Sequence, residues 1–241
     1  MASWIVHLRV AENLLSMNPG LDPSQFAVGN NGPDSGIPDE KWEKFNPPSE
    51  ITHFHAPEPC AHKSADLAFY RKYLAGRSWP AERVKEHSFL LGYFCHLVVD
   101  NLWSARIGLP TYDRFKAQFE ADPDFIWEVK KDWYGLDFVY VRTHPQCLYW
   151  SVFLHCEYPV NYLDALLPEG VRQRIEYIKT LYQRTDAEAE EMCSRERVYL
   201  TEKAMDQFVE EATRLLSRGI SLLREEPAGT DGKYSILELI R

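Results

Sequence analysis

Apolar side chains recur at helical spacing along much of the chain. Near the start, the apolar positions are three or four residues apart and comprise Trp4, Ile5, Leu8, Ala11, Leu14 and Leu15. This spacing predicts an amphipathic helix over about residues 3–16. A longer helix is predicted from Pro80 to Ala105, because proline suits a first helical turn and an apolar run follows at 89–99. That run is shorter than the roughly 20 residues needed to span a bilayer, so we expect a buried core helix and no membrane span.

Residues 18–60 break this periodicity. They hold more than half of the prolines of the chain and the glycine-rich stretch "GNNGPDSG". We therefore predict a long loop, with one short turn near residues 41–44. A loop of this length inside a compact domain is unusual and is generally functional.

The remaining periodicity is again helical. It predicts helices at about 62–75, at 111–133 with an interruption at "DPD", at 146–164, and from Glu169 to Leu223 with Thr201 as an N-cap. The stretch 134–146 fits either a helix or a short extended segment. Strand signals are scarce, so the predicted class is all-α, with one domain over 1–241. Residues 1–105 form its metal-site half and residues 106–241 a helical remainder.

Composition narrows the function. The chain has 241 residues and a formal net charge of −9, without a block of lysine and arginine, so the usual signature of nucleic-acid binding is missing. Five cysteines form no CxxC pair and are odd in number, which favours reduced thiols in a cytoplasmic protein. The first residues carry a helical pattern and no signal-peptide features, which also favours the cytoplasm.

A histidine and an aspartate interrupt the apolar run "GYFCHLVVD". His96 and Asp100 are four residues apart, so a helix places them on one face. An imidazole and a carboxylate at this spacing can bind zinc or another first-row metal, or can form a simple hydrogen bond. His62 and Asp66 have the same spacing but lie beside Lys63 and Ser64 at a helix start, so we expect them to be solvated.

Three further residues extend the pattern. His7 lies within the apolar pattern of the first helix, Asp34 in the glycine-rich loop, and His53 in the stretch "THFH". Taken singly, they fit a core histidine, a turn residue and a loop histidine. Together with His96 and Asp100 they form the order His, Asp, His, His-x3-Asp, which predicts a shared metal site.

This order, with the flanking segments "HLRVAENLL", "FAVGNNGPDSG", "THFH" and "LLGYFCHLVVD", resembles the zinc-dependent phospholipase C family over about the first 105 residues. The resemblance implies a helical bundle with a metal cluster between helices and a long metal-bearing loop. It implies a first zinc held by Asp34, His53, His96 and Asp100, and a second held by His7 with Asp100 as a bridge. Asp34 and Asp100 are then the catalytic carboxylates, and a metal-activated water attacks a phosphodiester.

The sequence also departs from that family. A third zinc needs a His-x3-Glu pair, whereas His144 and His155 are followed four residues later by Leu148 and Pro159. The chain start should lie about 9 Å along the helix axis from His7, on another face, so we expect no ligand from its amine. Asn30 is a candidate to complete the second site.

Other polar residues are candidates for supporting roles around the site. His55 is a solvated loop residue or lines the mouth of the site, and His87 has a core or supporting role. Arg106, Arg142 and His144 are candidate phosphate contacts. Two functions remain: a phosphoesterase that uses one or two zinc-like ions on a small phosphate ester, or a catalytically silent metal-binding domain with a regulatory or interaction role.

Overall fold

Helices dominate the computed structural model, which describes residues 1–41, 43–58, 60, 62–225 and 230–240. They make up 65% of the chain against 3% for strands, so the predicted all-α class is confirmed at this level. In chain order the α-helices are α1 (Trp4–Met17), α2 (Pro23–Gly29), α3 (Ser49–Thr52), α4 (Asp66–Tyr73), α5 (Val84–Trp103), α6 (Leu109–Arg114), α7 (Lys116–Ala121), α8 (Phe125–Thr143), α9 (Leu148–Ser151), α10 (Pro168–Leu181), α11 (Ala187–Ser194) and α12 (Glu202–Glu225).

Short elements connect these helices. Among the described residues the single 3-10 turns are η1 (Gly32–Asp34), η2 (Ala81–Arg83), η4 (Phe153–His155) and, in the C-terminal tail, η6 (Ile236–Glu238). A π-helical turn, η3 (Ser104–Gly108), joins α5 to α6. The strands β1 (Ile37–Pro38) and β2 (Phe45–Asn46) form a small antiparallel hairpin.

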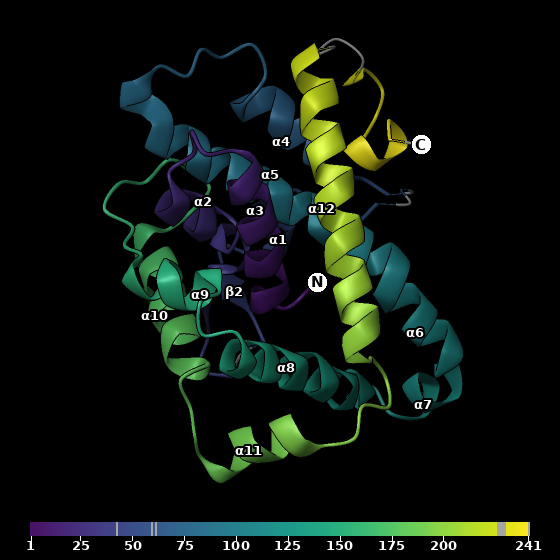
Figure 1. Ribbon diagram of the computed structural model, residues 1–241. Coiled ribbons are helices and arrows are strands. Elements are labelled where there is room, and N and C mark those ends of the chain that lie inside the picture. Colours follow the sequence, from purple (N-terminus) through teal and green to yellow (C-terminus); the bar gives the residue numbers. More distant parts are fainter. Residues whose placement is uncertain (42, 59, 61, 226–229, 241) are drawn as a thin grey trace.

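Helix α5 is the centre of the fold. Every residue from Ser88 to Trp103 is buried, and α1, α2, α4 and α12 all pack against the helix. The predicted core helix is therefore confirmed, with bounds a few residues inside the expected ones. Helix α12 runs along one side of the molecule, while α8 and α11 lie at the end furthest from the C-terminal tail (Figure 1).

The predicted loop at 18–60 is wrong in part, because it contains helices α2 and α3, the turn η1 and the β1–β2 hairpin. Trp42, within the turn expected at 41–44, lies outside the described residues. Asp22 caps α2 by accepting a hydrogen bond from the backbone N–H of Gln25 (2.8 Å), and Pro23 occupies the first turn. An aspartate followed by proline is a helix-start signal that the sequence carried. Helix α2 crosses α5 closely and fixes the backbone around Asn30 against it.

The second half of the chain also differs from the expected pattern. Residues 134–143 are helical, because α8 runs unbroken to Thr143. The helix expected at 146–164 is wrong: only α9 and η4 form there, and the rest is irregular. The continuous helical region from Glu169 is divided into α10, α11 and α12. Thr201 does cap α12, since its hydroxyl accepts a hydrogen bond from the N–H of Ala204 (3.3 Å).

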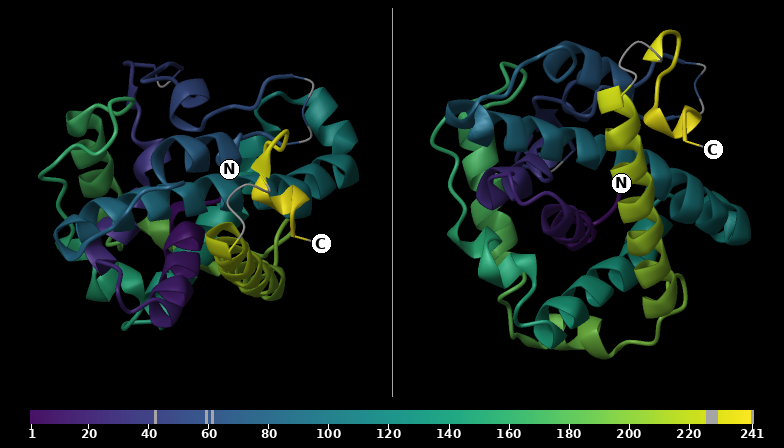
Figure 2. Two further views of the ribbon diagram at one scale, coloured as in Figure 1. Left: turned by 90° about the horizontal axis from the view of Figure 1, so that it is seen from above. Right: turned by 45° about the horizontal axis from the view of Figure 1, so that its top comes forward.

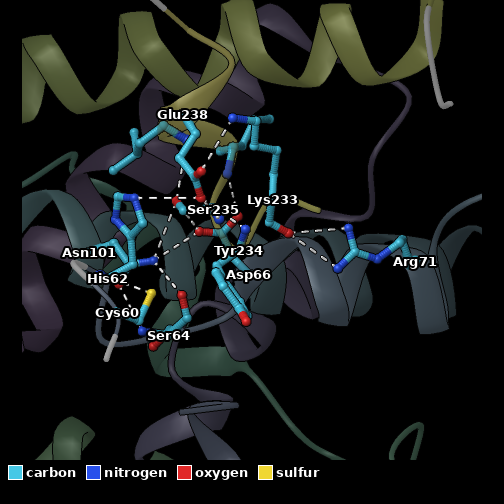
Figure 3. A network of polar contacts seen from close by, with 12 residues as sticks. Cys60, His62, Ser64, Asp66, Arg71, Asn101, Lys233, Tyr234, Ser235 and Glu238 are labelled. Atoms are coloured by element: carbon cyan, nitrogen blue, oxygen red, sulfur yellow. Dashed lines mark hydrogen bonds and ion pairs between the residues drawn. The ribbon is translucent and has the colours of Figure 1, made fainter. Parts of the chain in front are cut away.

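The C-terminal tail is held by a buried carboxylate, which corrects the expectation that Asp66 is solvated. The Asp66 side chain is fully buried and accepts hydrogen bonds from the Ser235 hydroxyl, from the N–H of Ile236 (2.8 Å) and from the Asn101 amide (2.9 Å) (Figure 3). His62, at the edge of the same network, lies 3.8 Å from Glu238. The tail thereby docks beside the end of α12 (Figure 2).

Two further predictions concerned membrane-spanning helices and the state of the cysteines. None of the helices in the described part of the chain is both long enough and apolar enough to cross a membrane. All five cysteines carry thiols that are not in disulfides, as the odd count suggested.

Candidate metal centre

The structure brings all five predicted metal ligands together. His7 projects from α1, Asp34 ends η1, His53 follows α3, and His96 and Asp100 lie one turn apart on α5. Their ligand atoms form two overlapping groups that could hold a metal ion, one of His7, His96 and Asp100 and the other of Asp34, His53 and His96. The prediction that His96 and Asp100 face the first helix is confirmed, since the rings of His7 and His96 stack 3.8 Å apart.

The spacing of the ligand atoms suits tetrahedral coordination. The Nε2 atom of His53 lies 3.3 Å from Asp34 Oδ1, 3.3 Å from His96 Nε2 and 3.6 Å from Asp100 Oδ2, and His96 Nε2 lies 3.5 Å from the same Asp100 oxygen. These separations exceed ordinary N–H···O hydrogen bonds. A tetrahedral zinc with bonds of about 2.0–2.2 Å places its ligands about 3.3–3.6 Å apart. Asp34, His53 and His96 therefore offer ligand atoms that fit one ion, and Asp100 Oδ2 lies beside two of them.

Asp100 faces both groups with different oxygens. Its Oδ2 atom is directed at His53 and His96, whereas its Oδ1 atom lies 3.5 Å from His7 Nε2. A carboxylate that presents one oxygen to each side is suited to bridging two ions. This arrangement matches the bridge that the family resemblance implied.

Neighbouring groups orient the imidazole rings of His96 and His53. His96 donates from Nδ1 to the backbone carbonyl of Asn30 (2.8 Å), and the Thr52 hydroxyl lies 3.2 Å from His53 Nδ1. Both contacts leave Nε2 directed at the cluster, as is usual for metal-binding histidines. Asn30 orients His96 through its main-chain carbonyl, and its side-chain N–H donates to the Phe26 carbonyl (3.0 Å), while its buried Oδ1 has no hydrogen-bond partner among the described residues.

Burial of His7 is the strongest local sign of a missing partner. The side chain is fully buried, and among the described residues neither ring nitrogen has a hydrogen-bond partner. Leaving a buried polar group unsatisfied costs about 1–3 kcal/mol. Burial, together with the charge of His96, lowers the pKa of His7 to about 4. The ring is neutral at physiological pH, which is the form that binds a metal.

The carboxylates remain ionised despite their burial. Burial opposes ionisation of Asp34, but the interaction with the neighbouring His53 side chain and the charge of His96 outweigh it and hold the pKa of Asp34 below its usual range. Trp4 adds a further donor, from its indole Nε1 to Asp34 Oδ2 (2.9 Å). For Asp100, burial is outweighed by the amino group of Met1 and by His96, so its pKa falls well below the usual value. Two anionic carboxylates and three imidazoles form a donor set typical of zinc and similar ions.

The first three residues lie against the cluster, contrary to expectation. Helix α1 starts only at Trp4, so residues 1–3 are extended and turn back toward α5. The backbone N–H of Ala2 donates to Asp100 Oδ1 (2.8 Å), and the charge of the Met1 amino group acts on Asp100. The expected separation of about 9 Å assumed a regular helix from the first residue, which the chain does not form.

A cavity of about 500 Å³ opens onto the cluster, and Asp34 and His53 are part of its wall. Residues 1–4, Phe45 and Pro47 also line the cavity, together with side chains from α8, α10 and α11. The wall is rich in aromatic rings, which include Trp4, Trp127, Trp133, Tyr134 and Tyr177. A cavity of this size is typical of small-molecule sites.

Most of the other polar residues singled out from the sequence lie outside this cavity. Arg106 pairs with Glu211 (3.0 Å), Arg142 pairs with Glu190 (3.0 Å), and His144 stacks on Tyr140 in a separate cavity of about 360 Å³. These three are therefore not phosphate contacts at the cluster. His155 is exposed on η4, and His87 stacks on Trp79 (4.7 Å).

His55 is half-buried, whereas the sequence suggested a solvated loop residue or a place at the mouth of the site. Its ring centroid lies 6.3 Å from that of His53, but the residue is not part of the cavity wall. Phe54, between the two histidines, adopts a left-handed backbone (φ 49°) that turns the chain directly after His53. Such a conformation is uncommon for a residue other than glycine.

The cationic side chains that do line the cavity are Lys130, Arg174 and Arg184, of which Arg184 is paired with Asp186 and Glu188. Sequence reasoning missed all three. A signal existed for Arg174, which lies among the apolar positions Val171, Ile175 and Ile178 on the buried face of α10. A charge on the apolar face of a helix is costly unless it is paired or functional.

No family model, curated protein or solved structure matches this chain. The resemblance to zinc-dependent phospholipases C therefore rests on the order of the five residues and the short segments around them. The geometry of the cluster stands independently of that resemblance.

Proposed function

We propose that the chain is a metal-dependent phosphoesterase, with zinc as the first candidate ion. One observation carries the proposal: a buried cluster of three imidazoles and two carboxylates adjoins a cavity of about 500 Å³, and two of its members, Asp34 and His53, are part of the cavity wall. A structural metal site is closed, whereas a catalytic one keeps a position open to substrate. The cavity supplies that opening at Asp34 and His53.

Two ions can be assigned ligands. Asp34, His53, His96 and Oδ2 of Asp100 would hold the first, and His7 with Oδ1 of Asp100 would contribute to the second. Bound divalent ions of this kind lower the pKa of water and stabilise the charge on a phosphoryl group. The order of these ligands also supports a relation to the zinc-dependent phospholipase C family.

The reaction would be hydrolysis of a phosphate ester. The oxygen of water bonds to phosphorus, the bond from phosphorus to the leaving oxygen breaks, and the proton released from water balances the alcohol that departs. The protein's own part is positioning: Trp4 holds Asp34, Asn30 and Thr52 orient His96 and His53, and the aromatic wall excludes water.

A metal-binding domain without activity is the second candidate, and the burial of the cluster favours it. His7, His53, His96 and Asp100 are each at most 1% exposed, so Asp34 is the most accessible donor. Such burial suits an ion that holds segments together. Turnover separates the two functions, because both predict bound metal.

The test combines metal analysis with activity. Protein purified without added metal is analysed for first-row metals, and hydrolysis of bis-p-nitrophenyl phosphate and a panel of phosphate monoesters is measured before and after chelation and zinc replacement. We expect about one or two equivalents of metal, with turnover that disappears on chelation and returns with zinc. Bound metal without hydrolysis of any ester would support the silent domain, and absence of metal binding would exclude both.

A further inference from the structure

Arg174 is a buried cation without an anionic partner. It is 8% exposed, and no carboxylate of the described chain lies within ion-pair distance of it. Its Nε atom has no hydrogen-bond partner there, and one terminal nitrogen makes only a long contact with the carbonyl of Gly36 (3.4 Å). A buried charge of this kind is expensive unless a ligand compensates it.

Aromatic rings hold the guanidinium in place. Its central carbon lies 5.3 Å from the ring centre of Trp4 and 5.6 Å from that of Tyr177. The two rings meet edge to face, with centres 5.6 Å apart. Cation–π contacts fix the plane of the group but leave its N–H donors available. An arginine held in this way is preorganised to bind an anion with two parallel hydrogen bonds.

The same tryptophan connects Arg174 to the metal cluster. The Trp4 ring packs under the guanidinium, and its indole N–H donates to Asp34 Oδ2. An anion that reaches Asp34 from the cavity therefore comes close to Arg174. Lys130 adds a second positive charge to the cavity wall: its ammonium lies over the Trp127 ring (4.4 Å), and the charge of Asp34 acts on it. Two cations beside a metal cluster favour a phosphate group that carries two negative charges.

The rest of the wall suits a flat apolar group. The Tyr134 ring lies 6.1 Å from the Trp4 ring, and Trp127, which also lines the cavity, is 57% exposed. Aromatic groups stack well on such surfaces. The volume of about 500 Å³ suits a drug-sized ligand.

We propose that Arg174 binds the phosphate of the substrate and that the aromatic wall selects phosphate monoesters of small aromatic alcohols. This inference rests on the proposed phosphoesterase function, because it names the substrate class of that site. It assigns Arg174 a direct contact with substrate oxygens, with Lys130 as a second cation.

Binding of a phosphonate that cannot be hydrolysed tests this proposal without turnover. Calorimetry on the zinc-loaded protein compares phenylphosphonate with methylphosphonate, which shares the charged group and lacks the ring. We expect phenylphosphonate to bind at least about tenfold more tightly. Arg174→Gln should weaken phenylphosphonate about tenfold or more, since a hydrogen bond to a charged group contributes about 1.5–3 kcal/mol.

Further variants distinguish loss of the phosphate contact from misfolding of the protein. Arg174→Lys keeps the charge and should retain part of the affinity, and Lys130→Gln, at a more exposed position, should weaken binding with little effect on folding. Arg106→Gln is the matched control, because that arginine pairs with Glu211 away from the cavity, and it should bind as wild type does. Zinc content and melting temperature are measured for each variant.

The outcomes separate this inference from the proposed function. Equal affinity for the two phosphonates, or unchanged binding in folded Arg174→Gln and Lys130→Gln, would overturn the inference even if the protein hydrolyses esters. If phenylphosphonate binds with the expected preference but no ester is hydrolysed, the anion site stands and the phosphoesterase proposal fails.

Discussion

At the scale of single residues, Asp100 is a buried carboxylate on which several polar groups of the cluster converge. It is 1% exposed, faces three histidines, and accepts a hydrogen bond from the N–H of Ala2. Its two oxygens are directed at different histidines. Replacement should therefore affect both halves of the cluster, whereas His7 belongs to one half.

We predict that Asp100→Asn loses metal at both positions, and that His7→Asn loses one ion and most of the turnover while the other ion stays bound. The amide keeps the shape of the side chain but removes a negative charge and is a poor bridging ligand. Metal stoichiometry and turnover of bis-p-nitrophenyl phosphate measure the difference. The exposed residue Asp113 on α6 provides the control Asp113→Asn, which should behave as wild type. Full metal content in Asp100→Asn would refute the bridging role.

Asp66 illustrates a different use of a buried carboxylate. Burial raises its pKa to about 7, although hydrogen bonds from Ser235, Ile236 and Asn101 act in the opposite direction. Between about pH 4 and 7 the folded protein therefore keeps a proton that the unfolded chain has released. The bound proton therefore raises the free energy of unfolding at low pH, and this contribution is lost as the pH rises through 7.

We predict that Asp66→Asn removes this part of the pH dependence. The wild type should lose stability relative to the variant between about pH 4 and 7, by up to about 1.4 kcal/mol per pH unit for one proton. Urea unfolding of the metal-free proteins at several pH values gives the difference, in which the titrations of other groups cancel. Asp113→Asn should leave the slope unchanged. Parallel stability curves for the wild type and Asp66→Asn would contradict the prediction.

At the scale of elements, the crossing of α2 and α5 positions His96. Two glycines make the close approach possible: a Cβ at Gly29 would lie 2.1 Å from the carbonyl oxygen of Phe89, and one at Gly92 would lie 2.3 Å from that of Phe26. The contact brings the Asn30 carbonyl to His96 Nδ1. The cluster thus depends on how tightly two helices pack.

We predict that Gly92→Ala separates α2 from α5, destabilises the protein by about 1–3 kcal/mol and weakens zinc binding. Overpacking of a close contact has a cost of this size, and the moved carbonyl no longer holds the His96 ring. Urea unfolding and zinc titration measure the two effects. Gly20→Ala is the control, since nothing lies within 4 Å of a Cβ there. Unchanged stability and affinity in Gly92→Ala would show that the helices adjust freely.

At the scale of the whole molecule, the cluster joins parts of the chain that are far apart in sequence. His7 comes from α1, Asp34 and His53 from the segment after α2, and His96 and Asp100 from α5. Apart from His96 and Asp100, which share one face of α5, these ligands come together only when the helices pack. A bound ion therefore stabilises the folded state and not the unfolded one.

We predict that zinc raises the melting temperature by about 5–10 °C when its free concentration is a hundred times the dissociation constant. Mass action then contributes about 2.7 kcal/mol, and a protein of this size gains about 2–4 °C per kcal/mol. Thermal unfolding with zinc and after chelation measures the shift. Magnesium prefers oxygen ligands and should give a much smaller one. Equal melting temperatures with and without zinc would count against the site.

The sequence alone determined the features that depend on local spacing. Helical periodicity identified α1 and α5, and the four-residue spacing of His96 and Asp100 placed both side chains on one face. These features follow from the geometry of a single helix. The order of His7, Asp34 and His53 then suggested that the ligands converge, which the packing of α1, η1 and α3 around α5 allows.

Two His-x3-Asp pairs have the same spacing, and only the tertiary structure decided which of them joins the metal cluster and which anchors the tail. His62 and Asp66 have the same spacing as His96 and Asp100, yet Asp66 anchors the C-terminal tail while Asp100 faces three histidines. Local sequence cannot distinguish the pairs, because the difference lies in the groups that distant segments bring to each carboxylate. The same reason explains Arg174 in the cavity wall and the return of residues 1–3 to Asp100: burial and charge depend on partners that are remote along the chain.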